Sequence, residues 1–240
     1  MTILQSEGAE ELGWLASEWY VIWTVQSTVD RSVSEASVAR DVVVRKRKRT
    51  FDEGVALEAI RGTFWDRGYA ATSLDDIMQA TGLGKGSLYA AFGNKRRMFA
   101  LALRQYCAGL VADAKRALHG PDAGAMKRLD AYLRRMSGVF TSSKRGCLLS
   151  KAVAEVVGED DEAKEIVLQC FQKYEHVLAD VLTQAKRAGE ARADLDVRRS
   201  ATFVLAVVRG MEGMGKGGVS ASTLNGVITT TIDSITPSRP

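Results

Sequence analysis

The segment that most constrains the fold lies between residues 72 and 95, where the sequence predicts two short helices joined by a glycine-containing turn. Thr72 or Ser73 can cap the first helix, because either hydroxyl can accept a hydrogen bond from an unpaired backbone N–H of the first turn. Asp75 or Asp76 follows three residues later, which completes the Ser/Thr-x-x-acid pattern of a helix start. The apolar residues of this helix recur at helical spacing: Leu74, Ile77 and Met78. One face of the helix must therefore pack against another element.

The second helix is expected over residues 85–92, between Gly84 and Gly93, because glycines favour helix ends. At about 100° per residue, Leu88 and Phe92 lie together and define its buried side. The opposite side carries only small residues: Gly86, Ser87 and Ala90. A solvated helix would normally carry Glu, Lys or Gln there, so this side is suited to lie closely against another surface.

Two kinds of surface fit such a small face. In the major groove of DNA, Ala90 or Ala91 could touch a thymine methyl group, and Ser87 could reach a base edge or a phosphate. Tyr89, on the flank, could reach the DNA backbone. The alternative is a tight helix–helix contact inside an ordinary bundle, and the face alone leaves both open.

Basic residues flank the two helices on both sides. Residues 45–49 form an unbroken run, RKRKR. Downstream, Asn94 can cap a helix that opens with Lys95, Arg96 and Arg97. Cations in a first helical turn oppose the helix dipole by roughly 0.3–1 kcal/mol each, so three of them need an external reason. DNA phosphates at the helix N-terminus would supply one.

The positive charge of the chain is concentrated around this segment. Residues 44–104 carry 12 basic and 6 acidic side chains, a net charge of +6, whereas residues 1–43 carry 2 basic and 7 acidic ones, a net charge of −5. Clustering of Lys and Arg in one domain is the electrostatic pattern of a nucleic-acid-binding protein. The sequence therefore predicts that this part of the chain binds double-stranded DNA.

Residues 49–103 resemble the N-terminal DNA-binding domain of the TetR/AcrR family of bacterial regulators. The resemblance rests on several spaced elements: Phe64, Gly68-Tyr69, Thr72-Ser73, Gly82, Gly86-Ser87-Leu88-Tyr89, Phe92 and Lys95. It implies an all-α fold, with an N-terminal three-helix helix-turn-helix DNA-binding head on a larger helical body that binds a ligand and dimerises. Residues 145–149, RGCLL, also look like a segment seen in some members at the start of a mid-domain helix.

The resemblance, together with the small helix face, gives a set of expected DNA-contacting residues: Thr72, Ser73, Lys85, Gly86, Ser87, Tyr89, Ala90, Lys95 and Arg96. Two residues depart from the family pattern. Gly84 stands where a Ser or Thr usually caps the recognition helix, which should remove one cap and one phosphate contact. Arg96 stands where an acidic residue commonly follows the Lys, which should strengthen non-specific attraction to DNA.

The chain is expected to divide into an N-terminal extension (1–44), the TetR-type helix-turn-helix domain (45–104, motif about 73–92) and a helical effector-binding and dimerisation domain (105–240). Before the motif, Leu57, Ile60 and Phe64 repeat on one face of a helix closed by Gly68. The other expected helices cover about 95–118, 123–140, 147–157, 160 or 161 to 189, 197–214 and 220–235. We expect the small head to lean on the long helix that begins at Lys95.

The last two expected helices carry a possible subunit interface. The first of them is almost continuously apolar, through Phe203, Val204, Val207, Val208 and Met211. A helix that is apolar on more than one face buries each of them, here one on the body and one against a second copy of the chain. With the resemblance, this predicts a homodimer through residues 197–214 and 220–235; the alternative is that the pair is simply core.

The body is expected to bind an unknown small-molecule effector. A pocket between its helices could be lined by Tyr106, Phe140, Cys147, Cys170, Phe171 and Tyr174. No cluster of acids or bases there specifies a charged molecule, so a mainly apolar effector is preferred. Cys147 could instead sense oxidants, although nothing local indicates a reactive thiol.

No catalytic or metal-binding motif and no cofactor site is expected. The three cysteines, which include Cys107, are widely spaced and form neither a metal motif nor a disulfide framework, so a reducing cytoplasm is the expected location. His119 and His176 stand alone. With 46% hydrophobic and 26% charged residues, the composition is that of a soluble globular protein.

Residues 1–44 allow three interpretations. Their acidic residues argue against a signal peptide, and the apolar stretch 12–29 is interrupted by Glu18 and barely long enough to span a bilayer. The region could be a misassigned start, with translation beginning near residues 42–44, or a loosely ordered extension. It could also be a functional arm or a membrane-contacting helix; we expect no membrane partner for the protein as a whole.

These observations predict a DNA-binding transcriptional regulator, a repressor that a small effector releases from a near-palindromic operator. Two other classes stay open. One is an effector-independent DNA-binding protein, such as a nucleoid or division factor; the other is a helical enzyme, for which no nucleophile–base or metal constellation is visible.

Overall fold

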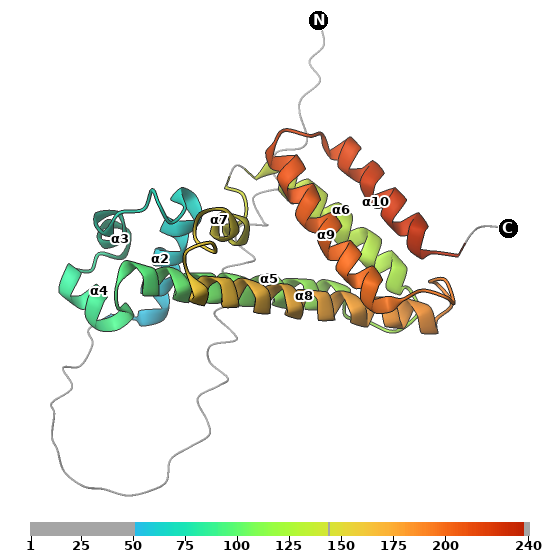
Figure 1. Ribbon diagram of the computed structural model, residues 1–240, viewed down its shortest axis with the longest axis horizontal. Helices are drawn as coiled ribbons and strands as arrows, with labels where there is room; N and C mark the ends of the chain where they lie inside the picture. Colours follow the sequence, from blue (N-terminus) through green and yellow to red (C-terminus); the bar gives the residue numbers. More distant parts are fainter. Residues whose placement is uncertain (1–50, 144, 238–240) are drawn as a thin grey trace, which may run out of the picture. The chain divides into compact units, whose positions relative to one another are not determined.

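The computed structural model describes residues 51–143 and 145–237, and every regular element in these residues is an α-helix (Figure 1). The helices are α2 (Glu53–Arg67), α3 (Leu74–Thr81), α4 (Lys85–Phe92), α5 (Lys95–Leu118), α6 (Ala125–Ser142), α7 (Leu148–Glu155), α8 (Asp161–Arg187), α9 (Val197–Lys216) and α10 (Ala221–Ile235). The all-α prediction is confirmed. The expected extension 1–44 and the basic run 45–49 lie outside the described residues.

Local capping explains why α3 begins and ends where the sequence predicts. The Ser73 hydroxyl accepts a hydrogen bond from the Asp76 N–H at 3.1 Å, and the Asp76 carboxylate accepts one from the Ser73 N–H at 2.8 Å. This is the reciprocal capping box that the sequence suggested. Gly82, in the left-handed conformation with φ of 66°, ends the helix. The adjoining turn can therefore be short.

The start of α6 has a cap that comes from far along the chain. The expected helix 123–140 is Ala125–Ser142 in the structure, and the residue before it, Gly124, offers no side-chain cap. Instead, the Glu190 carboxylate accepts hydrogen bonds from the N–H groups of Gly124 and Met126, the latter at 2.9 Å. A carboxylate at a helix N-terminus satisfies both the unpaired donors and the dipole. The contact ties the start of α6 to the end of α8.

The head has a core that continues into the body. Ile60, Phe64, Ile77 and Leu88 are fully buried, and the Phe64 ring meets the edge of Phe99 of α5 at 5.1 Å between centroids. Leu57, expected on the same face, is only partly buried and packs on the edge of this cluster. The cluster extends without a break to residues of α5, α7 and α8. The prediction that the head leans on α5 is thus confirmed.

The two ends of α5 serve different layers. Helices α2 and α4 pack on its first part, α8 runs beside it, α6 contacts its last part, and α9 and α10 pack against α6 (Figure 1). A second buried cluster fills the space between α6, α8, α9 and α10 and includes Leu129, Leu133, Leu178, Val204 and Ile228. The long helix therefore mechanically connects the small head to the body.

Two carboxyl groups have pKa values that the fold lowers. Hydrogen bonds from the N–H groups of Met126 and Gly124 lower the pKa of Glu190 below its ordinary value of 4.5. The Ser73 N–H and hydroxyl lower the pKa of Asp76 below 3.8 in the same way. Both carboxylates therefore stay charged to a lower pH in the folded protein than in the unfolded chain.

We expect the free energy of unfolding to fall when the pH drops below about 4.5. Groups with a depressed folded pKa stabilise the fold fully above their unfolded pKa, and this stabilisation is lost as the pH falls through the folded pKa. Urea midpoints measured from pH 7 down to about pH 3 test this. Glu190→Gln should reduce the acid-induced loss, whereas Glu165→Gln, on the exposed side of α8, should leave it unchanged. Equal midpoints at both ends of the range would contradict the prediction.

Candidate nucleic-acid interface

Helix α4 presents the small face that the sequence predicted. Leu88 and Phe92 are buried under it, whereas Gly86, Ser87 and Ala90 are exposed. Tyr89, on the flank, keeps 41% of its surface exposed. Within residues 51–143 and 145–237, no other helix packs tightly on the small side of α4, in contrast to the internal helix–helix contact that the sequence left open.

The glycines of α4 have no internal packing reason. A Cβ atom added at Gly84 or Gly86 would meet no other heavy atom within 4 Å. Gly84 is also the N-cap of α4 and supplies no side-chain hydrogen bond to its first turn, as expected from the missing Ser or Thr. Packing among the described residues therefore does not require glycine at these two positions, and their small size lets another molecule approach the backbone closely.

Two lysines stand at the two ends of α4. Lys85 opens the helix, and its ammonium group lies 5.8 Å from the centroid of the Tyr89 ring. Lys95, in the first turn of α5, lies 4.5 Å from the centroid of the Tyr69 ring. Each cation is held by a ring near a helix N-terminus, where unpaired backbone N–H groups also attract anions. The arrangement suits two phosphates on either side of the small face.

One of the two expected contacts at the start of α3 is corrected by the structure. Thr72 is only 1% exposed, and its hydroxyl donates a hydrogen bond to the Gly68 carbonyl at 2.6 Å. The prediction that its side chain reaches DNA is therefore wrong, because the hydroxyl already has a partner inside the head. Ser73 is exposed, and its hydroxyl also lies 2.7 Å from the Asp76 carboxylate. Of the two alternatives, Ser73 is the one at the surface.

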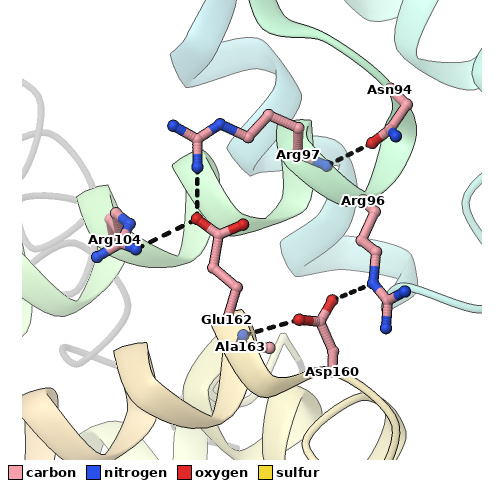
Figure 2. Close-up of polar contacts among 7 residues, drawn as sticks. All are labelled: Asn94, Arg96, Arg97, Arg104, Asp160, Glu162 and Ala163. Atoms are coloured by element: carbon pink, nitrogen blue, oxygen red, sulfur yellow. Dashed lines mark hydrogen bonds and ion pairs between the residues drawn. The ribbon is translucent and has the colours of Figure 1, made fainter.

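The first-turn arginines of α5 have partners within the chain (Figure 2). Arg96 pairs with Asp160, the N-cap of α8, and donates to the Glu159 carbonyl at 2.5 Å. Arg97 pairs with Glu162 in the first turn of α8. Phosphate is therefore not needed to explain these two cations, and the DNA contact expected of Arg96, whose side chain is 53% exposed, stays a prediction. The ion pairs instead fix the start of α5 against the start of α8.

Helix α7 holds the opposite side of the head. The Glu155 carboxylate accepts hydrogen bonds from the N–H groups of Tyr69 and Ala70, at 2.8 and 3.0 Å. It comes so close to Gly68, whose φ is 83°, that a Cβ there would lie 2.3 Å from a carboxylate oxygen. Lys151 donates to the Trp65 carbonyl at 2.5 Å. No sequence pattern pointed to Glu155 or Lys151, because their partners lie more than 80 residues away.

The RGCLL segment before α7 also contacts the head. The Arg145 guanidinium makes two contacts with the Asp66 carboxylate, and the one from Nη2 to Oδ2 measures 2.9 Å. The guanidinium also lies 4.4 Å from the centroid of the Trp65 ring. The Trp65 indole N–H in turn donates to the Gly146 carbonyl at 2.8 Å. The orientation of the head thus depends on α7 and on the turn that leads into it.

The six residues expected to bind an effector are distributed over two core clusters, and Phe171 packs against both of them. Tyr106 donates a hydrogen bond to the Cys147 sulfur at 3.2 Å, and both lie with Cys170 in or against the core cluster that adjoins the head. Tyr174 belongs to the other cluster, where its hydroxyl pairs with that of Tyr132. The remaining two, Phe140 and Phe171, are partly buried against core. The effector site stays a prediction.

Within residues 51–143 and 145–237, no group of three or more His, Cys, Asp or Glu side chains is placed to hold a metal ion. In the same residues, no helix combines the length and the apolar character needed to cross a membrane.

The chain is similar to known regulators in both of its parts. Residues 56–102 match the family profile of bacterial regulatory proteins of the tetR family, and residues 125–216 match the tetracyclin repressor-like C-terminal domain. It is 28% identical over 190 residues to the HTH-type transcriptional repressor ComR of Escherichia coli, covering 78% of this chain and 90% of ComR. It is 31% identical over 152 residues to the repressor KstR2 of Mycobacterium tuberculosis, covering 60% of this chain and 71% of KstR2.

A solved structure of similar fold contains DNA. The fold matches a cysteine mutant of the TetR-family regulator CifR, complexed with a 26-base-pair operator, with a TM-score of 0.67 and 28% identity over 78% of this chain and 99% of that one. The helical architecture, the exposed helix-turn-helix and these matches lead to one conclusion. The chain belongs to the TetR family of bacterial regulatory proteins.

Proposed function

We propose that this protein is a cytoplasmic, homodimeric transcriptional repressor that binds a near-palindromic operator through α4 of each subunit. A small, mainly apolar effector would release it. The observation that carries the proposal is the exposed, side-chain-poor face of α4, with a lysine at each end. The operator complex of CifR supports the same use of the head.

In this proposal the residues at the start of α3, on α4 and at the start of α5 contact different parts of the DNA. Lys85 and Lys95 neutralise phosphates on either side of the groove, where the two helix N-termini add their own attraction. Ser87 and Tyr89 reach base edges or backbone, and Ala90 can contact a thymine methyl group. Gly86 lets the backbone approach closely, and Ser73 stands at the edge of the motif.

The dimer would form through α9 and α10. On α9, Phe203 and Met214 are exposed by 47% and 40%, and Ala206 and Gly210 lie between them on the exposed side. A Cβ at Gly210, or at Gly226 of α10, would meet nothing within 4 Å, so packing inside the subunit does not require these glycines. A two-fold dimer through this surface would place its recognition helices about one DNA turn, or a multiple of it, apart.

Release would be a shift between two arrangements of the heads. The effector would favour a body conformation in which α7 and the start of α8 hold the heads at a spacing that no longer matches the operator. The contacts of Glu155, Lys151 and Arg96 with the head support this route, because a small movement of α7 or α8 must move the head with it.

The proposal is tested by footprinting the full-length protein on the intergenic DNA beside its own gene and titrating salt on the protected fragment. We expect log K to fall linearly with log salt, because bound lysines release counterions from phosphates. Lys95→Ala should weaken binding and reduce the slope by about one. Lys115→Ala, at the exposed far end of the same helix, should change neither quantity.

Four results would count against the proposal. Salt-independent binding, or equal effects of Lys95→Ala and Lys115→Ala, would remove the assigned surface. The absence of any footprint on its flanking DNA would remove the operator. A footprint that no small molecule in a library of apolar compounds relieves would favour the effector-independent DNA-binding alternative.

A further inference from the structure

Three cysteines lie in one buried region of the protein. Cys107 of α5, Cys147 at the start of α7 and Cys170 of α8 are all free thiols, exposed by only 6%, 7% and 2%, and belong to the same core cluster. The region joins the helix that carries the head to the two segments that hold the head in place. None of the contacts proposed for DNA or for the dimer uses these thiols.

Two of the three cysteines face each other across the α5–α8 seam. Arg96 of α5 pairs with a residue 64 positions later, Asp160, and Arg97 pairs with one 65 positions later. A nearly constant offset means that the two helices run parallel at this seam. Cys107 and Cys170 are 63 positions apart, are both buried and belong to the same core cluster, so the same register places them at the same level of the seam.

We propose that Cys107 and Cys170 form a redox-active thiol pair, which a small hydroperoxide converts into a disulfide and which thereby weakens operator binding. The first half of the proposal concerns only the two thiols. The second half rests on the proposed function. In a reducing compartment the pair would remain as thiols until an oxidant appears.

The electrostatics of the pair assign different roles to its members. The neighbouring Cys107 lowers the pKa of Cys170, and the nearby positive charge of Arg209 lowers it further. The neighbouring Cys170 and burial raise the pKa of Cys107. Since the thiolate is the nucleophile, Cys170 should react first and Cys107 should resolve the product.

Oxidation of the two thiols to a disulfide takes place in two steps. The Cys170 thiolate attacks the terminal oxygen of the hydroperoxide; an S–O bond forms, the O–O bond breaks, and the departing alkoxide takes up the proton released by Cys170. The product is a sulfenic acid. Cys107 then attacks the sulfenic sulfur; an S–S bond forms, the S–O bond breaks, and hydroxide leaves with the Cys107 proton as water. Two thiols and one hydroperoxide thus give one disulfide, one alcohol and one water.

A disulfide at this position would act on the head through α5. A disulfide holds its two sulfur atoms about 2.0 Å apart in a fixed side-chain geometry, much closer than two thiols in contact, so forming the bond changes how α5 packs on α8. The same seam carries the ion pairs of Arg96 and Arg97 at the start of α5 (Figure 2). A shift along it would therefore move the head relative to the body.

The test treats the full-length protein with hydrogen peroxide and maps its peptides without reduction. We expect a loss of two hydrogen atoms and one linkage, between the peptides of Cys107 and Cys170. Operator affinity should fall at least about fivefold, the lower end of known allosteric couplings, and return with dithiothreitol. Cys107→Ala and Cys170→Ala should each abolish the linkage and the affinity loss, whereas Cys147→Ala, the matched control in the same cluster, should keep both.

Peptide mapping of the wild-type protein decides the first half even if a variant folds poorly. Three thiols that stay free after treatment, or a linkage that includes Cys147, would overturn the thiol pair. Unchanged operator affinity in the linked protein, or an equal loss in Cys170→Ala, would overturn its effect on DNA binding. If the untreated protein binds no operator, the proposed function fails while the mapping still decides the thiol chemistry.

Discussion

Gly86→Glu is expected to lower operator affinity at least about 100-fold, although the variant should fold as well as the wild-type protein. Gly86 is the second residue of α4, is exposed, and has open space where a Cβ would stand. Glutamate is a better helix former than glycine and favours the first turn, so the fold should gain a few tenths of a kcal/mol or more. On the DNA side it adds bulk and a negative charge against phosphates, which costs several kcal/mol.

The comparison with other substitutions separates folding from recognition. Gly138→Glu is the matched control, because Gly138 is also exposed, helical and without a neighbour at its Cβ, but lies on α6. It should leave operator affinity unchanged. Gly86→Gln has the same bulk without the charge, so its affinity should fall between those of the wild-type protein and Gly86→Glu. Fluorescence anisotropy with the operator measures all three; wild-type affinity in Gly86→Glu would exclude α4 from the interface.

The head could be predicted closely because its signals are local. The capping box of Ser73 and Asp76, the Asn94 cap and Gly82 each act within a few residues, so a helix end can be inferred from neighbours in the sequence. The helical spacing of about 100° per residue likewise placed Leu88 and Phe92 on the buried side of their helix. The helix boundaries predicted from apolar periodicity and capping residues differ from those in the structure by at most a few residues.

The interpretation of the basic residues failed because their partners are distant in sequence. In the sequence, Arg96 and Arg97 have no acidic neighbour nearby, and DNA phosphate is an external partner that would balance their charge. Their carboxylates, Asp160 and Glu162, lie 64 and 65 residues further on, in a helix whose register with α5 cannot be read from one sequence. Local charge counting thus missed the two ion pairs that these arginines form within the chain.

A similar limit applies to Thr72. As a residue before a helix it resembles a cap or a surface contact, and its neighbour Ser73 fills the first of these roles. Only the three-dimensional turn from α2 to α3 shows that the Thr72 hydroxyl returns to Gly68 and is buried there. The Glu155 contact with the same turn is equally invisible in sequence, and it adds to the positive φ of 83° that favours glycine at position 68. Residues that join head and body therefore require the structure.

Phe203→Asp is expected to convert the proposed dimer into a monomer and to lower operator affinity about 100-fold or more. Phe203 is the most exposed large apolar residue of α9, at 47%, so a charge there should not disturb its own subunit. In a dimer the same charge would be buried against the second copy without a partner, at a cost of several kcal/mol. One head would then bind alone and lose the effective concentration that links two half-sites, which is worth about 10²–10⁴ in affinity.

Leu168→Asp provides the control for surface charge alone. Leu168 is 45% exposed on α8, outside the proposed dimer surface, and the substitution makes the same kind of change. Light scattering should give the mass of two chains for the wild-type protein and Leu168→Asp, and that of one chain for Phe203→Asp. If both variants remain dimers with wild-type affinity, the subunits must meet elsewhere, and the exposed glycines of α9 and α10 would need another partner. If both become monomers, the interface must extend to α8 and the spacing of the heads must be set by a broader surface.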